Sequence, residues 1–265
     1  MPKFAANLSM MFNEVEFLDR FAAAAEAGFT GVEYLFPYAW DKTELAERLA
    51  QAGLTQVLFN MPPGDWDAGE RGLAILPERK EEFRAGVETA IDYAKALGCG
   101  QLHCMAGLIP EGADPAVLRK TYVENLRYAA DKAGGAGIKL LIEAINTRDI
   151  PGFYLNTSDQ ALEIIEEVGS DNLAFQYDIY HMQIMEGDLL RTMAANLRRI
   201  AHLHLADNPG RHEPGTGEIN YPFLFEALDR IGYTGWIGCE YKPATTTNEG
   251  LGWFAPYRGR DTAAA

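Results

Sequence analysis

The chain has 265 residues, 48% of them hydrophobic, and a formal net charge of −15. A protein that gains affinity from a phosphate backbone needs a basic surface, so this charge argues against nucleic acid as a partner. No apolar run approaches the roughly 20 residues that span a bilayer, and the N-terminus lacks the apolar segment of a signal peptide, so we expect no membrane association.

A repeated pattern then organises the chain: a helical stretch ends at a glycine, and an apolar run rich in strand formers follows. Glycine just past a helix accepts the left-handed conformation that ends it. The first helix is predicted to begin at Asn13, with Glu16 completing a capping signal. The glycines are Gly28, Gly53, Gly98, Gly137, Gly169 and Gly232. The predicted strands are 3–8, 29–36, 54–60, 100–106, 138–145, 172–179, 201–206 and 233–241.

Eight strands that alternate with helices, most of them too apolar to have a solvated face, indicate a parallel sheet covered by helices. Eight units favour closure into an α/β fold of the (β/α)8 TIM-barrel type over an open sheet, and the length suits one such barrel. Because no linker or composition shift interrupts the chain, we expect a single domain over residues 1–265. No GxGxxG or GxxxxGK[ST] motif follows a strand, so we expect no nucleotide cofactor.

In such a barrel the active site lies at the carboxyl ends of the strands. Four consecutive predicted strands each end in a carboxylate or an imidazole. The first ends in Glu143, and the second places Gln176, Asp178 and Tyr180 on one face, followed by His181. The third carries His202 and His204, and the fourth carries Glu240. Taken singly, each is explained by a helix cap or a core histidine. Together on adjacent strands they favour a shared site. Three converging carboxylates would repel one another, and a divalent cation resolves that conflict.

The residues "LLIEAIN", "FQYDIYHMQ", "IAHLHLADNPGRHEPGTGEINY" and "GWIGCEYKP" resemble hydroxypyruvate isomerases, within the xylose-isomerase-like TIM-barrel superfamily. The resemblance also includes "GVEYLFPY" and "LFNMPPGDW", and it therefore covers nearly the whole chain. The stretch "PGRHEPGTGEIN" is its most specific part, because it separates this group from the ketose 3-epimerases that share the metal-binding strand ends.

The resemblance implies that Glu143, Asp178, His204 and Glu240 are metal ligands, that Glu143 and Glu240 form the catalytic acid/base pair, and that His181 contacts substrate. We expect His202 to lie beside the ligands, because two histidines of one strand do not readily reach one ion. Three carboxylates with one histidine suit Mg²⁺ or Mn²⁺ better than Zn²⁺. Whether this subgroup requires the ion is left open.

The implied reaction interconverts hydroxypyruvate and tartronate semialdehyde through a metal-stabilised enediolate, with no redox cofactor. Isomerisation of 2-oxo-tetronate and C3 epimerisation of a ketose are the alternatives within the superfamily. An endonuclease-IV-like repair enzyme conflicts with the net charge, and a sugar-acid-binding protein needs no acid/base pair. The substrate would be a small hydroxy or oxo acid.

A substrate of this kind carries a carboxylate, for which we expect Arg211, His212 or Lys242 as partners. Asn60 and His103 are weaker candidates for substrate contact. One of Glu33 and Tyr34 must face inward. Aromatic side chains in 34–40 and Trp66 are expected to form walls around the substrate.

Three cysteines without CxxC spacing, Cys99, Cys104 and Cys239, are typical of reduced thiols and favour a cytoplasmic location. Members of the superfamily are often dimers or tetramers, so a homo-oligomer is one state open to this chain. The apolar segment 248–257 is expected either to form an interface or to pack on the barrel, and 260–265 is expected to be a frayed end.

Overall fold

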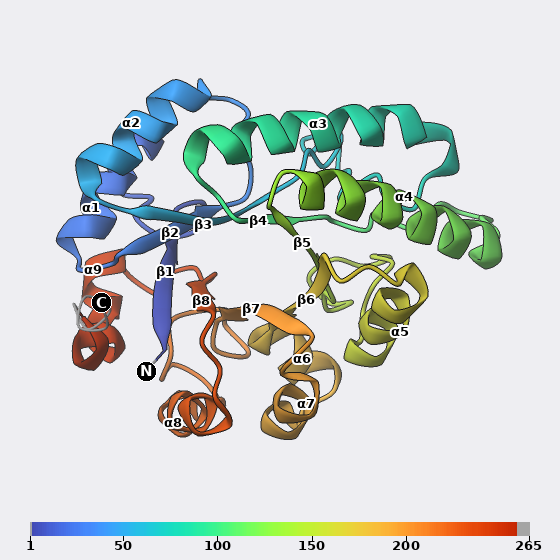
Figure 1. Cartoon of the computed structure of the whole chain (residues 1–265). Helices are drawn as coiled ribbons and strands as arrows, with labels where there is room; N and C mark the ends of the chain where they lie inside the picture. Colours follow the sequence, from blue (N-terminus) through green and yellow to red (C-terminus); the bar gives the residue numbers. More distant parts are fainter. Residues whose placement is uncertain (1, 259–265) are drawn as a thin grey trace.

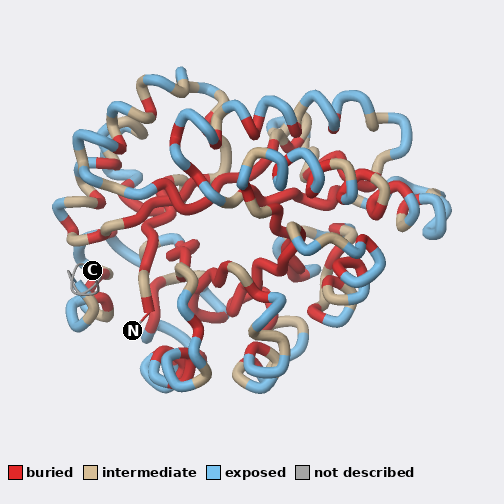
Figure 2. The backbone as a smooth tube through the Cα atoms, in the orientation of Figure 1, coloured by how far each residue is buried: buried red, intermediate tan, exposed pale blue. Residues whose placement is uncertain are grey.

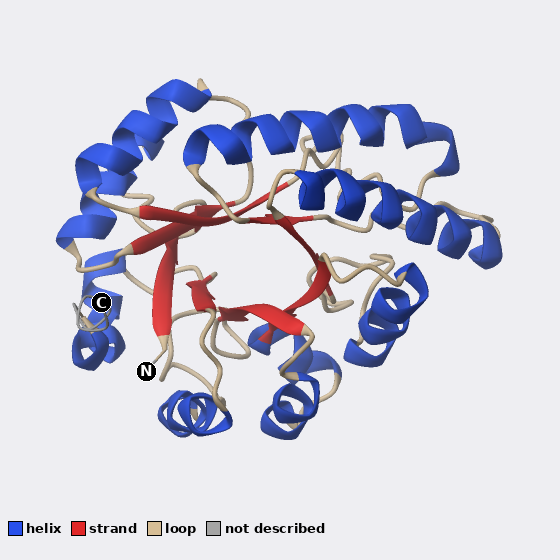
Figure 3. Ribbon diagram, viewed as in Figure 1, coloured by secondary structure: helices blue, strands red, loops and turns tan. Residues whose placement is uncertain are grey.

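The computed structural model describes residues 2–258, in which eight parallel strands follow one another in chain order and close into a barrel. Figure 3 shows the strands as a central ring with the helices outside it. The strands are β1 (Lys3–Asn7), β2 (Gly31–Tyr34), β3 (Thr55–Asn60), β4 (Gln101–His103), β5 (Lys139–Glu143), β6 (Leu173–Asp178), β7 (Ile200–Leu205) and β8 (Trp236–Cys239). The TIM-barrel prediction and all eight predicted strands are confirmed. Most strands are shorter than predicted, because the apolar runs continue into the loops beyond the paired residues.

Helices follow the strands around the outside of the ring (Figure 1). The α-helices are α1 (Arg20–Glu26), α2 (Lys42–Ala52), α3 (Lys80–Leu97), α4 (Pro115–Gly135), α5 (Ser158–Val168), α6 (Ile179–Met185), α7 (Leu189–Asn196), α8 (Tyr221–Ile231) and α9 (Thr247–Gly250). Short 3-10 segments are η1 (Phe17–Asp19), η2 (Pro77–Arg79) and η3 (Leu251–Tyr257). No helix among the described residues is long and apolar enough to cross a bilayer.

The prediction that the first helix begins at Asn13 was wrong. The Asn13 side chain donates to the backbone oxygen of Met10, and the first helical turn is the 3-10 segment η1. Glu14, which lies between Asn13 and the predicted cap partner, accepts instead from Thr247 near the other end of the chain. A capping pattern read from neighbouring residues takes no account of that distant partner.

The glycines predicted to end helices do so in the left-handed conformation. Each has a positive φ, between +62° and +95°, and lies between a helix and the strand that follows: Gly28, Gly53, Gly98, Gly137, Gly169 and Gly232. A side chain in this conformation is strained, which explains why the repeated pattern depends on glycine.

Most of the hydrophobic core lies between the strands and the helices, and Figure 2 shows the strands buried while the outer helix faces are exposed. A smaller cluster joins Ala5, Val57, Leu58, Leu141 and Ala174 from four different strands. These strands are not all neighbours in the barrel, so the cluster fills part of its interior. The barrel interior is therefore packed with side chains and is not an open channel.

The C-terminal segment packs on the barrel. Phe254 is buried, and Phe4 of β1 contacts the rings of Trp253 and Tyr257 at centroid distances of 5.2 Å each. Of the two expectations for 248–257, packing on the barrel is confirmed, and 260–265 lies outside the described residues. Three cysteines, Cys99, Cys104 and Cys239, are free and buried.

Candidate active site

Four acidic and imidazole side chains converge at the carboxyl ends of consecutive strands. Glu143 ends β5, Asp178 ends β6, His204 lies near the end of β7, and Glu240 directly follows β8. Each offers one ligand atom, and these atoms all lie within 4.8 Å of one another. All four side chains are buried. The strand register brings Asp178 beside His204, so the convergence is built into the sheet.

His204 lies at the centre of this group. Its Nδ1 atom is 3.5 Å from Oε1 of Glu143, 3.6 Å from Oε2 of Glu240 and 3.9 Å from Oδ2 of Asp178. The same nitrogen lies 3.4 Å from the amide nitrogen of Gln176. One imidazole nitrogen therefore faces all three carboxylates.

The three carboxyl groups have unequal environments. Burial raises the pKa of Asp178, and the charge of Glu143 adds to this shift. Burial would likewise raise the pKa of Glu240, but His204 and Arg211 hold that pKa well below its ordinary range. Burial opposes ionisation of Glu143 too, yet the nearby His204 and His103 lower its pKa. Burial and neighbouring charges thus shift the pKa values of the three acids in different directions, as in many acid/base sites.

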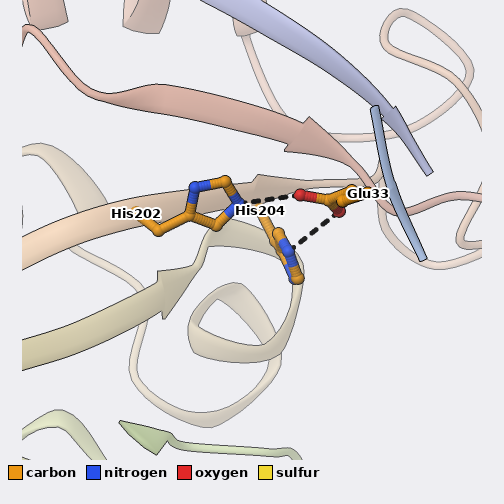
Figure 4. A group of neighbouring side chains, drawn as sticks. All are labelled: Glu33, His202 and His204. Carbon is orange, nitrogen blue, oxygen red and sulfur yellow. Dashed lines mark hydrogen bonds and ion pairs between the residues drawn. The ribbon is translucent and has the colours of Figure 1, made fainter. Parts of the chain in front are cut away.

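The opposite side of His204 is held by a buried carboxylate from β2. Oε1 of Glu33 lies 3.0 Å from Nε2 of His204, and Oε2 lies 2.9 Å from Nε2 of His202 (Figure 4). Asn7 donates a hydrogen bond to Oε1 of Glu33 at 3.0 Å. Burial would raise the pKa of Glu33, but His204 and His202 lower it to about 2. Glu33 is therefore a carboxylate that accepts hydrogen bonds from Asn7 and His202, and its ion pair with Nε2 orients His204 with Nδ1 turned to the acid cluster.

Glu33 occupies space that Gly238 leaves open. A Cβ atom at position 238 would overlap both carboxylate oxygens of Glu33. Gly238 pairs with His204 in the strand register, so the glycine, the glutamate and the histidine meet at one level of the barrel. Of the two candidates in β2, Glu33 is the residue that faces these histidines. Tyr34 instead packs against Phe17, at a centroid distance of 5.4 Å.

The side chain of Asn146, three residues after Glu143, orients His181. Nδ2 of Asn146 lies 2.6 Å from Nδ1 of His181. The His181 backbone N–H donates to Oδ1 of Asp178, which thereby caps α6. Oδ2 of the same carboxylate belongs to the acid cluster, at 3.9 Å from Nδ1 of His204. Asp178 is thus both a helix cap and a member of the cluster, and sequence reasoning had treated these as alternatives.

His103 and Asn60 lie at corresponding positions on neighbouring strands. Oδ1 of Asn60 lies 3.0 Å from Nδ1 of His103, which leaves Nε2 of His103 at 3.8 Å from Oε2 of Glu143. Burial lowers the pKa of His103. Asn60 on β3 therefore orients His103 on β4, and His103 in turn faces Glu143.

A cavity of about 540 Å³ opens above the cluster. Among the residues predicted to bind substrate or to act as acid and base, seven line it: Asn60, His103, Glu143, His181, Arg211, Glu240 and Lys242. Asp178 and His204 are not among the lining residues. The structure therefore divides the four ligand candidates into two glutamates that border the cavity and two residues that lie beneath them.

Arg211 is paired with two acids of the site. Nη2 lies 2.6 Å from Oε2 of Glu240, and Nη1 lies 3.2 Å from Oδ2 of Asp149. His212, the other expected carboxylate partner in this loop, does not line the cavity and instead contacts the backbone oxygen of Lys242 at 2.7 Å. Lys242 does line the cavity, although β8 ends three residues earlier, at Cys239.

Asp207 organises the loop that carries Arg211, a role that sequence reasoning missed. Its fully buried carboxylate accepts from the backbone N–H groups of Gly215 and Gly217 at 2.9 Å and of Ile219 at 3.0 Å. The Arg211 backbone N–H donates to the Asp207 backbone oxygen. The loop after β7 is therefore a folded unit, and its position sets where Arg211 lies.

The expected aromatic walls are present only in part. Trp66 lines the cavity, and Phe36 packs edge-on against it at 4.9 Å. The other three rings of 34–40 pack elsewhere: Tyr34 and Trp40 contact Phe17, and the Tyr38 hydroxyl donates to the backbone oxygen of Asn60. The cavity also has an arginine that sequence reasoning did not consider, Arg71, from the loop after β3.

The donor set fits a divalent cation. Oε1 of Glu143 is buried and accepts no good hydrogen bond from any residue in the described part of the chain. Burial and the nearby charge of Glu143 raise the pKa of Asp178, and a bound cation would favour its ionised form. Three carboxylates and one imidazole are a donor set that suits Mg²⁺ or Mn²⁺.

Comparison with known proteins agrees with this architecture. The model of the family described as xylose isomerase-like TIM barrel matches residues 21–257. The chain is 55% identical to a 2-oxo-tetronate isomerase of Cupriavidus necator, over 98% of this chain and 100% of the relative. It is also 55% identical to a hydroxypyruvate isomerase of Escherichia coli, over 97% and 100% of the two chains. A crystal structure from Brucella melitensis, titled AP endonuclease, family 2, superimposes with a TM-score of 0.96 at 53% identity, covering 97% of this chain and 100% of that one.

Proposed function

This chain belongs to the xylose isomerase-like TIM barrel family and is an isomerase, and we propose that it interconverts hydroxypyruvate and tartronate semialdehyde. One observation carries the proposal. Of the four clustered candidates, only Glu143 and Glu240 border the cavity, whereas Asp178 and His204 lie beneath. This arrangement suits two glutamates that exchange protons with a substrate above a site that holds a cation.

Glu143, Asp178, His204 and Glu240 would hold a divalent cation, whose charge would stabilise the negative charge that develops on an enediolate. One glutamate removes a proton from C3 of hydroxypyruvate, and the C2–C3 enediolate forms. The other glutamate helps deliver a proton to C2, while the hydroxyl proton passes from O3 to O2, and the product is the aldehyde isomer. The substrate neither gains nor loses electrons overall, so the reaction needs no redox cofactor.

The surrounding residues orient the two glutamates. Arg211 holds Glu240 through an ion pair at 2.6 Å, and His103 lies 3.8 Å from Glu143. His181 lines the cavity in an orientation fixed by Asn146, and we propose that it contacts a substrate oxygen. Asn60 and Lys242 complete the proposed set of substrate contacts.

Turnover of hydroxypyruvate with and without EDTA tests the proposal, together with metal analysis of the purified protein. We expect activity to be lost with EDTA and restored by Mn²⁺ or Mg²⁺. Glu143→Gln and Glu240→Gln should each lower kcat about 10²- to 10⁴-fold while the fold is kept. Absence of turnover by the metal-loaded wild type would overturn the assignment, and full activity of either variant would remove that glutamate from the mechanism.

Isomerisation of 2-oxo-tetronate is the second candidate. A relative with that name matches this chain as well as the hydroxypyruvate isomerase does, at 55% identity. The reacting carbons are the same in both substrates, and the four-carbon acid adds one hydroxymethyl group. Measuring kcat/KM for both acids with one enzyme preparation decides between them. Incubation with fructose or tagatose tests the ketose 3-epimerase alternative.

We also propose a cytoplasmic location and a homo-oligomeric state. Three buried, free thiols support a reducing compartment. Light scattering of the purified protein measures the oligomeric state directly. A gel shift at low salt tests the expectation that a chain of net charge −15 does not retain DNA.

A further inference from the structure

We propose that Arg71 binds the carboxylate of the substrate, at the wall of the cavity opposite Arg211. The inference rests on the proposed function, because it takes the substrate to be a small oxo acid. It differs from the expectation that Arg211, His212 or Lys242 performs this task. Arg71 lies in the segment between β3 and η2, and it lines the same cavity as Glu143 and Glu240.

The Arg71 side chain is held in place before any ligand binds. Its guanidinium lies over the ring of Trp66, 3.8 Å from the ring centre. Nη1 donates to the backbone oxygens of Trp66 at 3.0 Å and Glu70 at 2.6 Å. Stacking and these two hydrogen bonds fix the plane of the group, so little side-chain freedom remains to be lost when an anion binds.

The segment that carries Arg71 is itself anchored to the barrel. Glu70 accepts from the backbone N–H of Asp65 at 2.6 Å and pairs with Arg79 at 2.7 Å. Gly72 has a φ of +114°, and a Cβ there would overlap the backbone oxygen of Met105. The loop therefore packs directly on the backbone that follows β4, and the position of Arg71 at the cavity is well defined.

The charge of Arg71 is available, whereas that of Arg211 is already compensated. Arg211 lies between Glu240 and Asp149 and would have to weaken one of these ion pairs to bind an incoming carboxylate. Among residues 2–258, no carboxylate forms an ion pair with Arg71, whereas Arg79 of the same segment is paired with Glu70 and Glu82. A guanidinium with a free edge is well suited to bind a carboxylate through two parallel hydrogen bonds.

The position of Arg71 also suits the chemistry. β3 and β7 lie opposite each other in a closed barrel of eight strands, so the loops bearing Arg71 and Arg211 rise from opposite sides. Glu143 and Glu240 would repel a substrate carboxylate placed beside them. An acid that directs its carboxylate to Arg71 keeps this charge away from the glutamates while its reacting carbons face them. A neutral ketose has no group that requires Arg71.

Steady-state kinetics and ligand binding test the proposal. In Arg71→Met, we expect the KM for hydroxypyruvate to rise about 10- to 100-fold with little change in kcat, because the carboxylate does not react. The Kd of D-glycerate, an unreactive three-carbon acid, should rise by a similar factor in calorimetry, while weak binding of glycerol should not change. Arg71→Lys, which keeps the charge and much of the stem, should show an intermediate loss.

Two arginine variants serve as comparisons. Arg191→Met removes an exposed charge on α7 and should leave KM and kcat unchanged. Arg211→Met should lower kcat more than it raises KM, because Arg211 positions Glu240. Equal KM and equal glycerate affinity in wild type and a folded Arg71→Met or Arg71→Lys variant would overturn the proposal.

The same experiments distinguish a wrong reaction from a wrong carboxylate site. If wild type does not turn over hydroxypyruvate, the assigned reaction is wrong. Glycerate binding that is lost in Arg71→Met would still support Arg71 as the carboxylate site in that case. If wild type turns over hydroxypyruvate but Arg211→Met alone loses glycerate binding, the reaction stands and the site at Arg71 does not.

Discussion

Oε1 of Glu33 lies 3.0 Å from Nε2 of His204, on the side of the imidazole opposite the acid cluster. Oε2 of the same carboxylate accepts from His202 at 2.9 Å. A carboxylate that binds one ring nitrogen of a metal-binding histidine fixes which nitrogen faces the ion and increases its basicity. Glu33 therefore acts on the proposed metal site through His204, without being one of the four candidate ligands.

Glu33→Gln tests this arrangement, because glutamine keeps the shape of glutamate and removes its charge. We expect the Kd for Mn²⁺ to rise about 10- to 100-fold, measured from free Mn²⁺ by electron paramagnetic resonance. At saturating Mn²⁺ most of the turnover should return. Glu26→Gln, at an exposed position of α1, is the matched control. An unchanged Kd in Glu33→Gln would show that His204 is oriented without Glu33.

Gly238→Ala places a methyl group where the carboxylate of Glu33 lies. We expect a loss of about 1–3 kcal/mol in the free energy of unfolding, because the overlap is with buried groups that are themselves held by hydrogen bonds. Urea denaturation measures this loss. At Gly100 an added Cβ meets nothing within 4 Å, so Gly100→Ala serves as the control.

A double-mutant cycle with Glu33→Ala tests why Gly238→Ala lowers the free energy of unfolding. If the methyl group acts by displacing the glutamate, the two losses in unfolding free energy should be clearly less than additive. Additive losses would mean that Gly238 is needed for a reason other than the space occupied by Glu33.

Asp207→Ala removes the acceptor of four buried or partly buried backbone N–H groups, those of Asn208, Gly215, Gly217 and Ile219. We expect at least about 2 kcal/mol of lost stability, since unpaired buried donors cost about 1–3 kcal/mol each. The kcat should fall as well, because the loop positions Arg211 against Glu240. Glu226→Gln, on the exposed face of α8, should alter neither quantity. A stable but inactive variant would separate loop placement from folding.

The loop that carries Arg71 should have a characteristic dependence on pH. Hydrogen bonds from Arg79 and from the backbone of Asp65 lower the pKa of Glu70 below its ordinary 4.5. A lowered folded-state pKa contributes stability above pH 4.5, and this contribution is lost as the pH falls through the lower, folded-state value. Unfolding free energies of wild type should therefore fall more steeply below pH 4.5 than those of Glu70→Gln.

Glu78→Gln, at an exposed position of η2, controls for the loss of one acidic residue from the same segment. Equal pH slopes for wild type and Glu70→Gln between pH 5 and the acid limit of the folded state would rule out this contribution of Glu70.

Local sequence patterns were sufficient to predict the barrel and much of the site. A glycine that ends each helix and an apolar run that follows it are consequences of neighbouring residues, so they were visible without the structure. Glu143, Asp178, His204 and Glu240 were predictable as a group, because parallel strands in a closed barrel bring their carboxyl ends to the same face.

Other features depend on residues that are far apart in the sequence. Alternation in β2 showed that one of Glu33 and Tyr34 faces inward, but the choice depends on space left by Gly238 in the last strand. Arg71 lies in a loop without a regular period, and its orientation depends on stacking against Trp66. The start of the first helix depends on a partner of Glu14 near the other end of the chain.

The contact between Gly238 and Glu33 has a consequence for how this protein can vary during evolution. Any residue larger than glycine at 238 displaces the acid, and loss of the acid leaves His202 and His204 without the carboxylate that both contact. Neither position is therefore free to change alone. Among relatives, we expect substitutions at 33 and 238 to occur together, accompanied by a change at 202 or 204, so that these positions on three strands are inherited as one unit.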